Sequence, residues 1–208
     1  MFNNVQPTCF KHSKALLYAD DLKLFCPISN ISDCKLLQTD IDCLSNWCSV
    51  WKLNLNLPKC NVITFTNKKN NILYGYKLFG SGLLRVSHIK DLGVIICSNL
   101  CFNKHVHHTV PKAFKLLGFI KRNCLKDFKE KTLKNLYMAL VRPQIDYATV
   151  IWNPNGAHKG NTACVENIQR RFIKNLCFKR NSKYHRADYP DLCRNLSLTI
   201  PWKTGGIF

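Results

Sequence analysis

The sequence predicts an α+β fold in which an antiparallel sheet with one covering helix precedes a basic helical region. Two observations predict it. Short apolar runs separated by turn residues fill most of residues 13–96, with one stretch of helical periodicity among them. After about residue 100, apolar residues recur at every third or fourth position. We therefore expect a sheet-containing part over residues 1–98, helices over 99–180 and an irregular polar tail over 181–208.

The first predicted element is a β-hairpin within residues 13–28. Apolar runs at residues 15–19 and 22–25 flank Asp20 and Asp21. Alternating apolar segments around a short polar pair are typical of a two-stranded hairpin. The tight turn is expected to carry the two adjacent carboxylates.

A helix is predicted next, over residues 32–50, with Ser32 as its N-cap. Its apolar face comprises Leu36, Leu37, Ile41, Leu44, Trp47, Cys48 and Trp51. A strand at residues 61–66, a polar turn at 67–71 and two or three short strands within 72–96 complete the sheet part.

Three helices are predicted in the basic part. The first covers residues 106–120, with Pro111 near its first turn, and the second covers 133–141 and stops at Pro143. A short continuation over 145–152 and a third helix over 165–176 follow.

Charge is the strongest feature of the composition. The chain has 31 Lys and Arg against 12 Asp and Glu, a net charge of +19, yet residues 1–50 carry five acids and four bases. A local acidic site within a basic chain is typical of a metal-dependent enzyme that acts on nucleic acid. The alternative is charge that only solvates helix faces.

Other classes are excluded or disfavoured. No apolar run approaches the length of a membrane span, the 46% hydrophobic content can fill a core, and residues 1–14 lack the apolar region of a secretory signal. The twelve cysteines are scattered without a C-x-x-C pair, which favours buried thiols over disulfides. One alternative stays open, a zinc-stabilised binding module built on Cys97, Cys101, His105, His107 and His108.

Asp20 and Asp21 are the candidate metal ligands. Mg²⁺ prefers carboxylate oxygens, and two such ions can activate a hydroxyl and stabilise a leaving oxygen. The alternative is ordinary turn chemistry, in which Asp is frequent.

The segment Tyr18-Ala19-Asp20-Asp21 resembles the catalytic hairpin of reverse transcriptases. Residues 14–25, KALLYADDLKLF, are close to the form found in non-LTR retrotransposons of the jockey and related LINE-type groups. Residues 47–65 resemble the next palm motif and residues 88–95 the strand before the thumb. Residues 116–122, 136–152 and 165–172 resemble the helices beyond it. The resemblance covers about residues 1–196.

This resemblance implies a partial polymerase palm followed by a thumb-like region, and an RNA-directed DNA polymerase as the parent enzyme. The cofactor would be Mg²⁺, with Mn²⁺ as an alternative, and the partners an RNA template, a DNA primer and dNTPs. Asp20 would bind metal with Asp21 beside it, and Tyr18 would pack under the primer end. Lys59 would protonate the leaving pyrophosphate.

The basic helices would follow a phosphate backbone without reading sequence. The residues expected to do so are Lys112, Lys115, Lys121, Arg170, Arg171 and Lys174.

The resemblance also implies missing parts. Fingers, a palm segment with a further metal-binding Asp and a Gly-rich motif would precede the hairpin, whereas nineteen residues precede Asp20 here. We therefore expect an inactive fragment truncated at both ends; a catalytically dead, basic nucleic-acid-binding remnant is the alternative. The expected location is intracellular, in nucleus and cytoplasm as a ribonucleoprotein, without a membrane partner.

Overall fold

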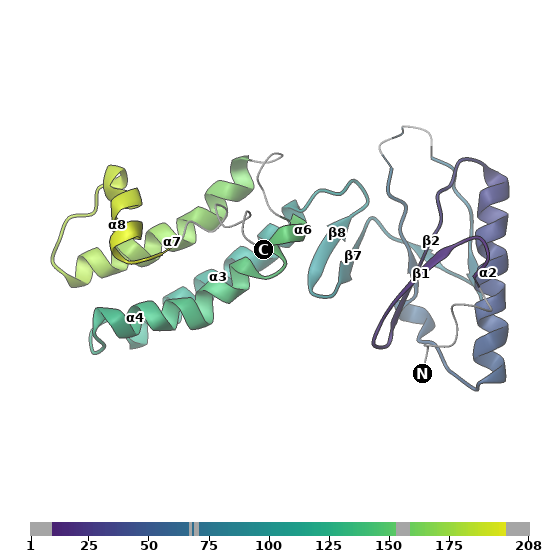
Figure 1. The fold of residues 1–208 in the computed structure, drawn as a ribbon, viewed down its shortest axis with the longest axis horizontal. Helices are drawn as coiled ribbons and strands as arrows, with labels where there is room; N and C mark the ends of the chain where they lie inside the picture. The colour runs from purple at the N-terminus through teal and green to yellow at the C-terminus, as the bar shows by residue number, and fades with distance from the viewer. Residues whose placement is uncertain (1–9, 67, 69–70, 153–158, 199–208) are drawn as a thin grey trace. The chain divides into compact units, whose positions relative to one another are not determined.

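A computed structural model describes residues 10–66, 68, 71–152 and 159–198 (Figure 1). Part of the polar turn predicted at 67–71 and all of residues 201–208 lie outside them. The chain divides into two compact units, Met1–Ile89 and Lys90–Phe208. The structure is α+β, as predicted, and about half helical. No helix of the described part is long and apolar enough to cross a membrane.

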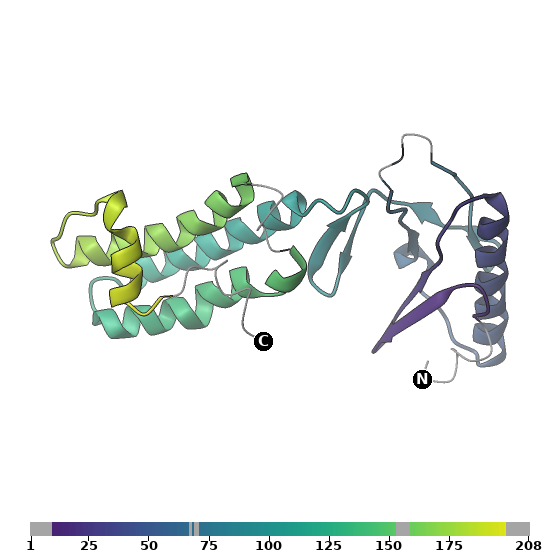
Figure 2. The same cartoon turned by 45° about the horizontal axis from the view of Figure 1, so that its top comes forward.

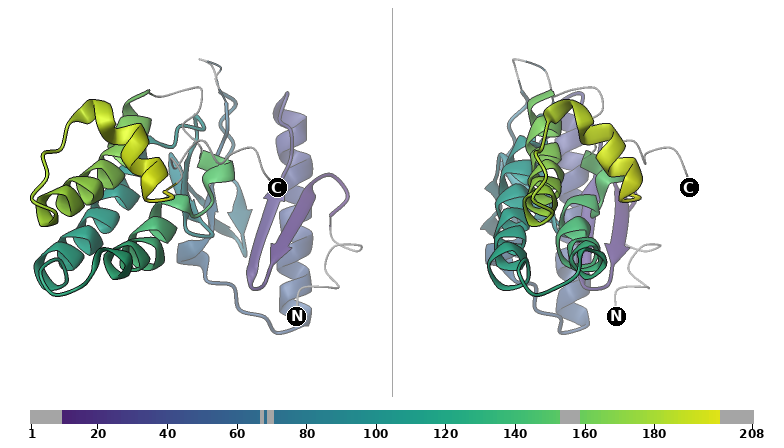
Figure 3. Two further views of the ribbon diagram at one scale, coloured as in Figure 1. Left: turned by 60° about the vertical axis from the view of Figure 1, so that its left-hand side comes forward. Right: turned by 90° about the vertical axis from the view of Figure 1, so that its left-hand side faces the viewer.

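The first unit contains a hairpin, one long helix and several very short strands. The hairpin is β1 (Lys14–Tyr18) with β2 (Asp21–Phe25), and the helix is α2 (Ile31–Val50). The remaining elements are the 3-10 turn η2 (Leu57–Lys59), β3 (Asn61–Val62), β4 (Lys77–Leu78), β5 (Ser81–Gly82) and β6 (Leu84–Arg85). In Figure 3 the purple hairpin lies alongside α2.

The prediction of one antiparallel sheet is wrong. Each sheet among the described residues has two strands; in the first unit these are β1 with β2, β4 with β5, and β3 with β6, the last pair parallel. The chain reverses at Phe79 and Gly80, whose φ angles are 51° and 76°, directly after the two residues of β4. The two strands that flank this turn are two residues long, and the strand predicted at 61–66 shortens to two residues.

Helix α2 forms where periodicity predicts it, but its cap differs. Asn30, not Ser32, is the N-cap: its side chain accepts from the Asp33 backbone N–H, and the Asp33 carboxylate accepts from the Asn30 backbone N–H. This reciprocal pair satisfies two backbone N–H groups at the start of the helix. Ser32 is already the second residue of the helix and so cannot be its N-cap. The buried apolar face is Cys34, Ile41, Leu44 and Cys48.

A further hairpin, β7 (His88–Asp91) with β8 (Val94–Cys97), starts just before the first residue of the second unit. Helices follow: α3 (Asn103–Asn123), α4 (Glu130–Leu136), α5 (Arg142–Asp146), α6 (Thr149–Trp152), α7 (Lys159–Lys179) and α8 (Tyr189–Asn195), with the 3-10 turn η4 (Arg186–Asp188) (Figure 2). Val94 of β8 belongs to the helical core, in which the rings of Tyr137 and Phe172 stack 4.2 Å apart.

Two proline predictions need correction. Pro111 lies well inside α3 rather than in its first turn, because the helix begins at Asn103. Pro143 does not end the second helix. A π-helical turn, η3 (Tyr137–Val141), precedes it and α5 continues past it. Because the π-helical turn changes the hydrogen-bond pattern before Pro143, the helix continues although the proline nitrogen has no hydrogen to donate.

The stretch predicted to be irregular after residue 180 contains α8. Tyr189 and Cys193 are buried against the helical core, together with Leu196 and Leu198 beyond the helix end. Tertiary burial of these few apolar residues outweighs the polar composition of the segment.

Candidate functional site

The hairpin β1–β2 presents the carboxylates at its tip. Tyr18 pairs with Asp21, so the two turn residues are Ala19 and Asp20 rather than the two aspartates. Ala19 has φ 51°, a left-handed conformation that a two-residue hairpin requires. Asp20 therefore lies in the turn and Asp21 begins β2, with both side chains exposed.

Apolar contacts hold one face of the hairpin on α2. Leu22 and Leu24 pack against Leu44 and Cys48 of the helix. The other face is open: Leu16 is 57% exposed and Tyr18 is 63% exposed.

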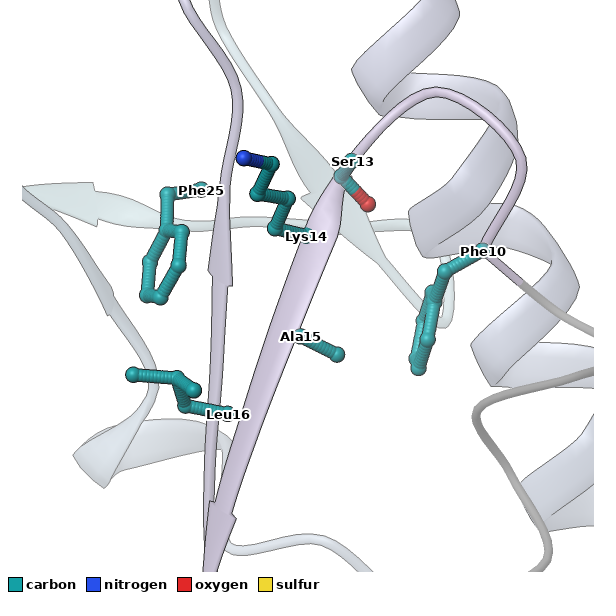
Figure 4. A pocket seen from close by; sticks show the side chains of 6 residues that line it. All are labelled: Phe10, Ser13, Lys14, Ala15, Leu16 and Phe25. Carbon is teal, nitrogen blue, oxygen red and sulfur yellow. The ribbon is translucent and has the colours of Figure 1, made fainter.

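A hollow of about 360 Å³ lies beside β1 (Figure 4). Lys14, Leu16 and Phe25 point to one side of the hairpin, whereas Ala15 and Phe10 lie on the other side. Among the described residues β1 pairs only with β2, so the hollow borders an open strand edge.

A buried carboxylate on α2 fixes the chain that enters β1. Asp40 is 2% exposed and accepts hydrogen bonds from the backbone N–H groups of Lys11, His12 and Ser13, at 3.2, 3.0 and 2.7 Å. The Ser13 hydroxyl donates a fourth bond at 2.7 Å. Burial alone would raise the pKa of Asp40, but these four donors outweigh it and hold the pKa below its ordinary value.

The anchoring role of Asp40 was not predicted from the sequence. Asp40 lies between Leu37 and Leu44 at helical spacing, and an acid within an apolar face was the available signal. Its lone pairs are occupied by the chain's own donors, so it cannot serve as a third ligand beside the hairpin. Asp33 caps α2, and Asp42 accepts from Gln38.

The donor set at the hairpin tip fits a hard divalent cation in kind, because both side chains offer carboxylate oxygens. In number it is a half-site, because two carboxylates supply only part of the oxygen ligands that such an ion needs. The described residues contain no group of three or more His, Cys, Asp or Glu side chains that could hold a metal ion. Further ligands would have to come from another chain segment.

Lys59 and Tyr18, the other predicted catalytic and primer-binding residues, are exposed in the same unit. Lys59 ends η2. Within the described part of the chain, Lys59 makes no hydrogen bond or ion pair with Asp20 or Asp21. Tyr18 lies directly before the turn, on the open face of the hairpin.

The candidate zinc ligands are divided between core and surface. Cys97 and His105 are buried, and His105 Nδ1 accepts a hydrogen bond from the Ile95 N–H at 3.3 Å while its ring lies 5.3 Å from that of Trp152. His107 and His108 are exposed. Burial lowers the pKa of His105, as do the nearby charges of His108 and Lys112, and the Ile95 N–H occupies its Nδ1.

Three contacts show that α3 and α7 run parallel, side by side. The Asn161 side chain donates to Asn103, the Arg171 guanidinium lies 5.1 Å from the centre of the Phe114 ring, and Lys179 Nζ donates to the Leu125 and Lys126 carbonyls. The partners on both helices advance in the same chain direction.

The predicted phosphate contacts do not share one face. Lys112, Lys115, Lys121, Arg171 and Lys174 are all exposed. Lys112 and Lys121 are nine residues apart, which at 3.6 residues per turn places them on roughly opposite sides of α3.

Adjacent arginines on α7 have different surroundings. Arg170 forms an ion pair with Glu166 at 3.1 Å and lies 4.9 Å from the Tyr189 ring of α8, whereas Arg171 faces α3. Arg170 is therefore engaged in joining α7 to α8.

Comparisons with known proteins give one distant similarity. No protein-family model and no solved structure matches the chain. The RNA-directed DNA polymerase from mobile element jockey of Drosophila funebris is 29% identical over 140 residues. The match covers 65% of this chain and 15% of that protein. The chain thus resembles a small part of a non-LTR retrotransposon reverse transcriptase, at a distance.

Proposed function

We propose that the chain is a fragment of an RNA-directed DNA polymerase of a mobile element. The observation that carries the proposal is the tight β1–β2 hairpin, which presents Asp20 and Asp21 together at its exposed tip. The distant similarity to the jockey polymerase supports it. In this proposal residues 1–98 are the palm-like part and residues 99–180 the thumb-like part.

In the complete parent enzyme, Asp20 would bind Mg²⁺ or Mn²⁺ directly and Asp21 would share the site. Two such ions supply activation of the attacking hydroxyl and charge stabilisation at the leaving pyrophosphate. Tyr18 would support the primer end beside the turn. Lys59 would donate a proton to the pyrophosphate, which is a role suited to a lysine among phosphates.

The partners would be an RNA template, a DNA primer and a dNTP. Of the predicted backbone contacts, those with exposed charges would meet the phosphates: Lys112, Lys115, Lys121, Arg171 and Lys174.

A second candidate function is a basic nucleic-acid-binding remnant without catalysis. The half-site at the hairpin favours it, since no third carboxylate accompanies Asp20 and Asp21 among the described residues. Binding would persist in such a remnant because phosphate contacts do not need the metal.

Primer extension and binding, measured together, test both. The full chain is mixed with a labelled DNA primer on an RNA template, dNTPs and Mg²⁺, and a polarisation titration runs in parallel. We expect salt-sensitive binding without extension, because a half-site cannot hold both ions in working geometry. Extension that is lost in Asp20→Ala would establish an active enzyme and exclude the remnant. Absence of binding at low salt would contradict both candidates.

A further inference from the structure

Arg171 is held in place by an aromatic ring of the neighbouring helix. Its guanidinium lies 5.1 Å from the centre of the Phe114 ring, yet the residue stays exposed. A guanidinium that stacks by its face keeps its N–H donors free at the edge, where they match a phosphate in two-point contact. Because the side chain is already ordered, little conformational freedom is lost on binding.

One turn along α3, a glycine gives room to a second arginine. A Cβ on Gly118 would lie 3.2 Å from Arg122 Nη1. Gly118 has no positive φ that would demand glycine, and glycine is a poor residue inside a helix. The missing side chain instead lets the Arg122 guanidinium fold back over the helix surface.

Phe114, Gly118 and Arg122 recur at four-residue intervals and so form one strip of α3. Arg171 contacts the start of this strip, and Lys174 follows one turn later on the parallel helix α7. Helix α3 contains no acidic residue, and the single acid of α7, Glu166, is paired with Arg170 on the α8 side. The strip therefore carries cations without a competing carboxylate from either helix.

We infer that this strip, together with Arg171 and Lys174, is a seat for the sugar–phosphate backbone of a single nucleic-acid strand. The inference rests on the proposed function and specifies which surface binds and which form of nucleic acid. Phe178 follows Lys174 by one turn and is 75% exposed. An exposed ring beside cations offers a stacking face to an unpaired base, whereas the bases of a duplex are already stacked.

The test uses the full chain and labelled oligonucleotides of one length, single-stranded and duplex, titrated by polarisation at several salt concentrations. Arg122→Gln and Arg171→Gln are each expected to weaken single-strand binding by roughly 5–10-fold and to reduce the salt slope by about one. Lys183→Gln is the matched control, since Lys183 is exposed outside the strip. It removes the same charge and should change affinity less than about twofold.

Two further variants separate the seat from simple charge and from folding. Gly118→Ala keeps every charge and improves helix propensity, so the melting temperature should not fall, yet displacement of Arg122 should weaken binding by about threefold. Phe178→Ala should weaken single-strand binding and leave duplex binding unchanged.

Arginine variants that behave like Lys183→Gln would overturn the seat while leaving nucleic-acid binding, and so the proposed function, intact. Equal effects of Phe178→Ala on single strand and duplex would overturn the single-strand assignment. If the unmodified chain binds no oligonucleotide at low salt, both the seat and the proposed function fail.

Discussion

The Asp40 carboxylate of α2 accepts hydrogen bonds from both the backbone N–H and the hydroxyl of Ser13, each at 2.7 Å. This contact fixes the residue that immediately precedes β1, and through it the start of the hairpin that carries Asp20 and Asp21. A carboxylate twenty residues from Asp20 in sequence thus anchors the base of the hairpin, at the end opposite the turn.

Asp40→Ala should destabilise the first unit by about 2–4 kcal/mol, because three backbone N–H groups and one hydroxyl lose a buried, charged acceptor. Ser13→Ala should cost about 1 kcal/mol. Denaturant unfolding, with hydrogen exchange of the β1–β2 amides, measures both effects. Asp42→Ala is the control: its carboxylate is exposed, two positions further on the same helix, and accepts a hydrogen bond from Gln38. Equal losses for Asp40→Ala and Asp42→Ala would contradict the anchoring role.

Stability should depend on pH through two groups whose pKa values are lowered in the fold. At pH values above the pKa that it has in the unfolded chain, Asp40 contributes stability. This stability is lost as the pH falls through the lower pKa that Asp40 has in the fold. His105 acts in the same direction at higher pH, because the unfolded chain takes up a proton below about pH 6.5 and the buried ring resists it. His105→Gln should remove the loss of stability that begins as the pH falls below about 6.5 in melting curves of the chain. An unchanged pH profile in this variant would contradict the assignment.

Arg170 and Arg171 should respond differently to substitution. Arg170→Ala should lower the melting temperature, since it removes the contact with Tyr189 and the partner of Glu166, and should change the salt slope of nucleic-acid binding little. Arg171→Ala should leave the melting temperature nearly unchanged and reduce the salt slope of nucleic-acid binding. Thermal melting and salt-dependent titration of both variants provide the comparison, and identical profiles would show that the two surroundings have no energetic meaning.

The open face and edge of the hairpin should promote self-association. Leu16 is 57% exposed and Phe25 42% exposed on a sheet of two strands. Leu16→Lys with Phe25→Lys should shift sedimentation toward monomer, whereas Val50→Lys, on a residue that is 77% exposed at the end of α2, should not. A sharp monomer boundary for the unmodified chain would refute this expectation.

The sequence predicted the elements that depend on local pattern. Helices α2, α3 and α7 follow apolar periodicity, and the β1–β2 hairpin follows alternation around a short polar pair. It could not predict what depends on distant contacts. Tyr189 of α8 is buried against the helical core, and β3 pairs with β6, which lies more than twenty residues later in the chain.

The candidate site was predictable in part for the same reason. Asp20 and Asp21 are adjacent in sequence, so a turn suffices to bring them together. The role of Asp40 depends on donors from residues 11–13, about 28 positions earlier, and no local pattern links the two. The split between Arg170 and Arg171 required knowing which helix lies on each side of α7.

Paramagnetic broadening by Mn²⁺ in amide NMR spectra tests the central claim, that Asp20 and Asp21 form the half-site at which the parent enzyme would bind its divalent cation. Titration of the full chain should selectively broaden the signals of Tyr18, Ala19 and Leu22, and excess Mg²⁺ should reverse the effect. Asp20→Ala should abolish the broadening and Asp42→Ala should leave it intact. Broadening that is centred elsewhere, or that survives Asp20→Ala, would contradict the assignment of this turn as the metal-binding element.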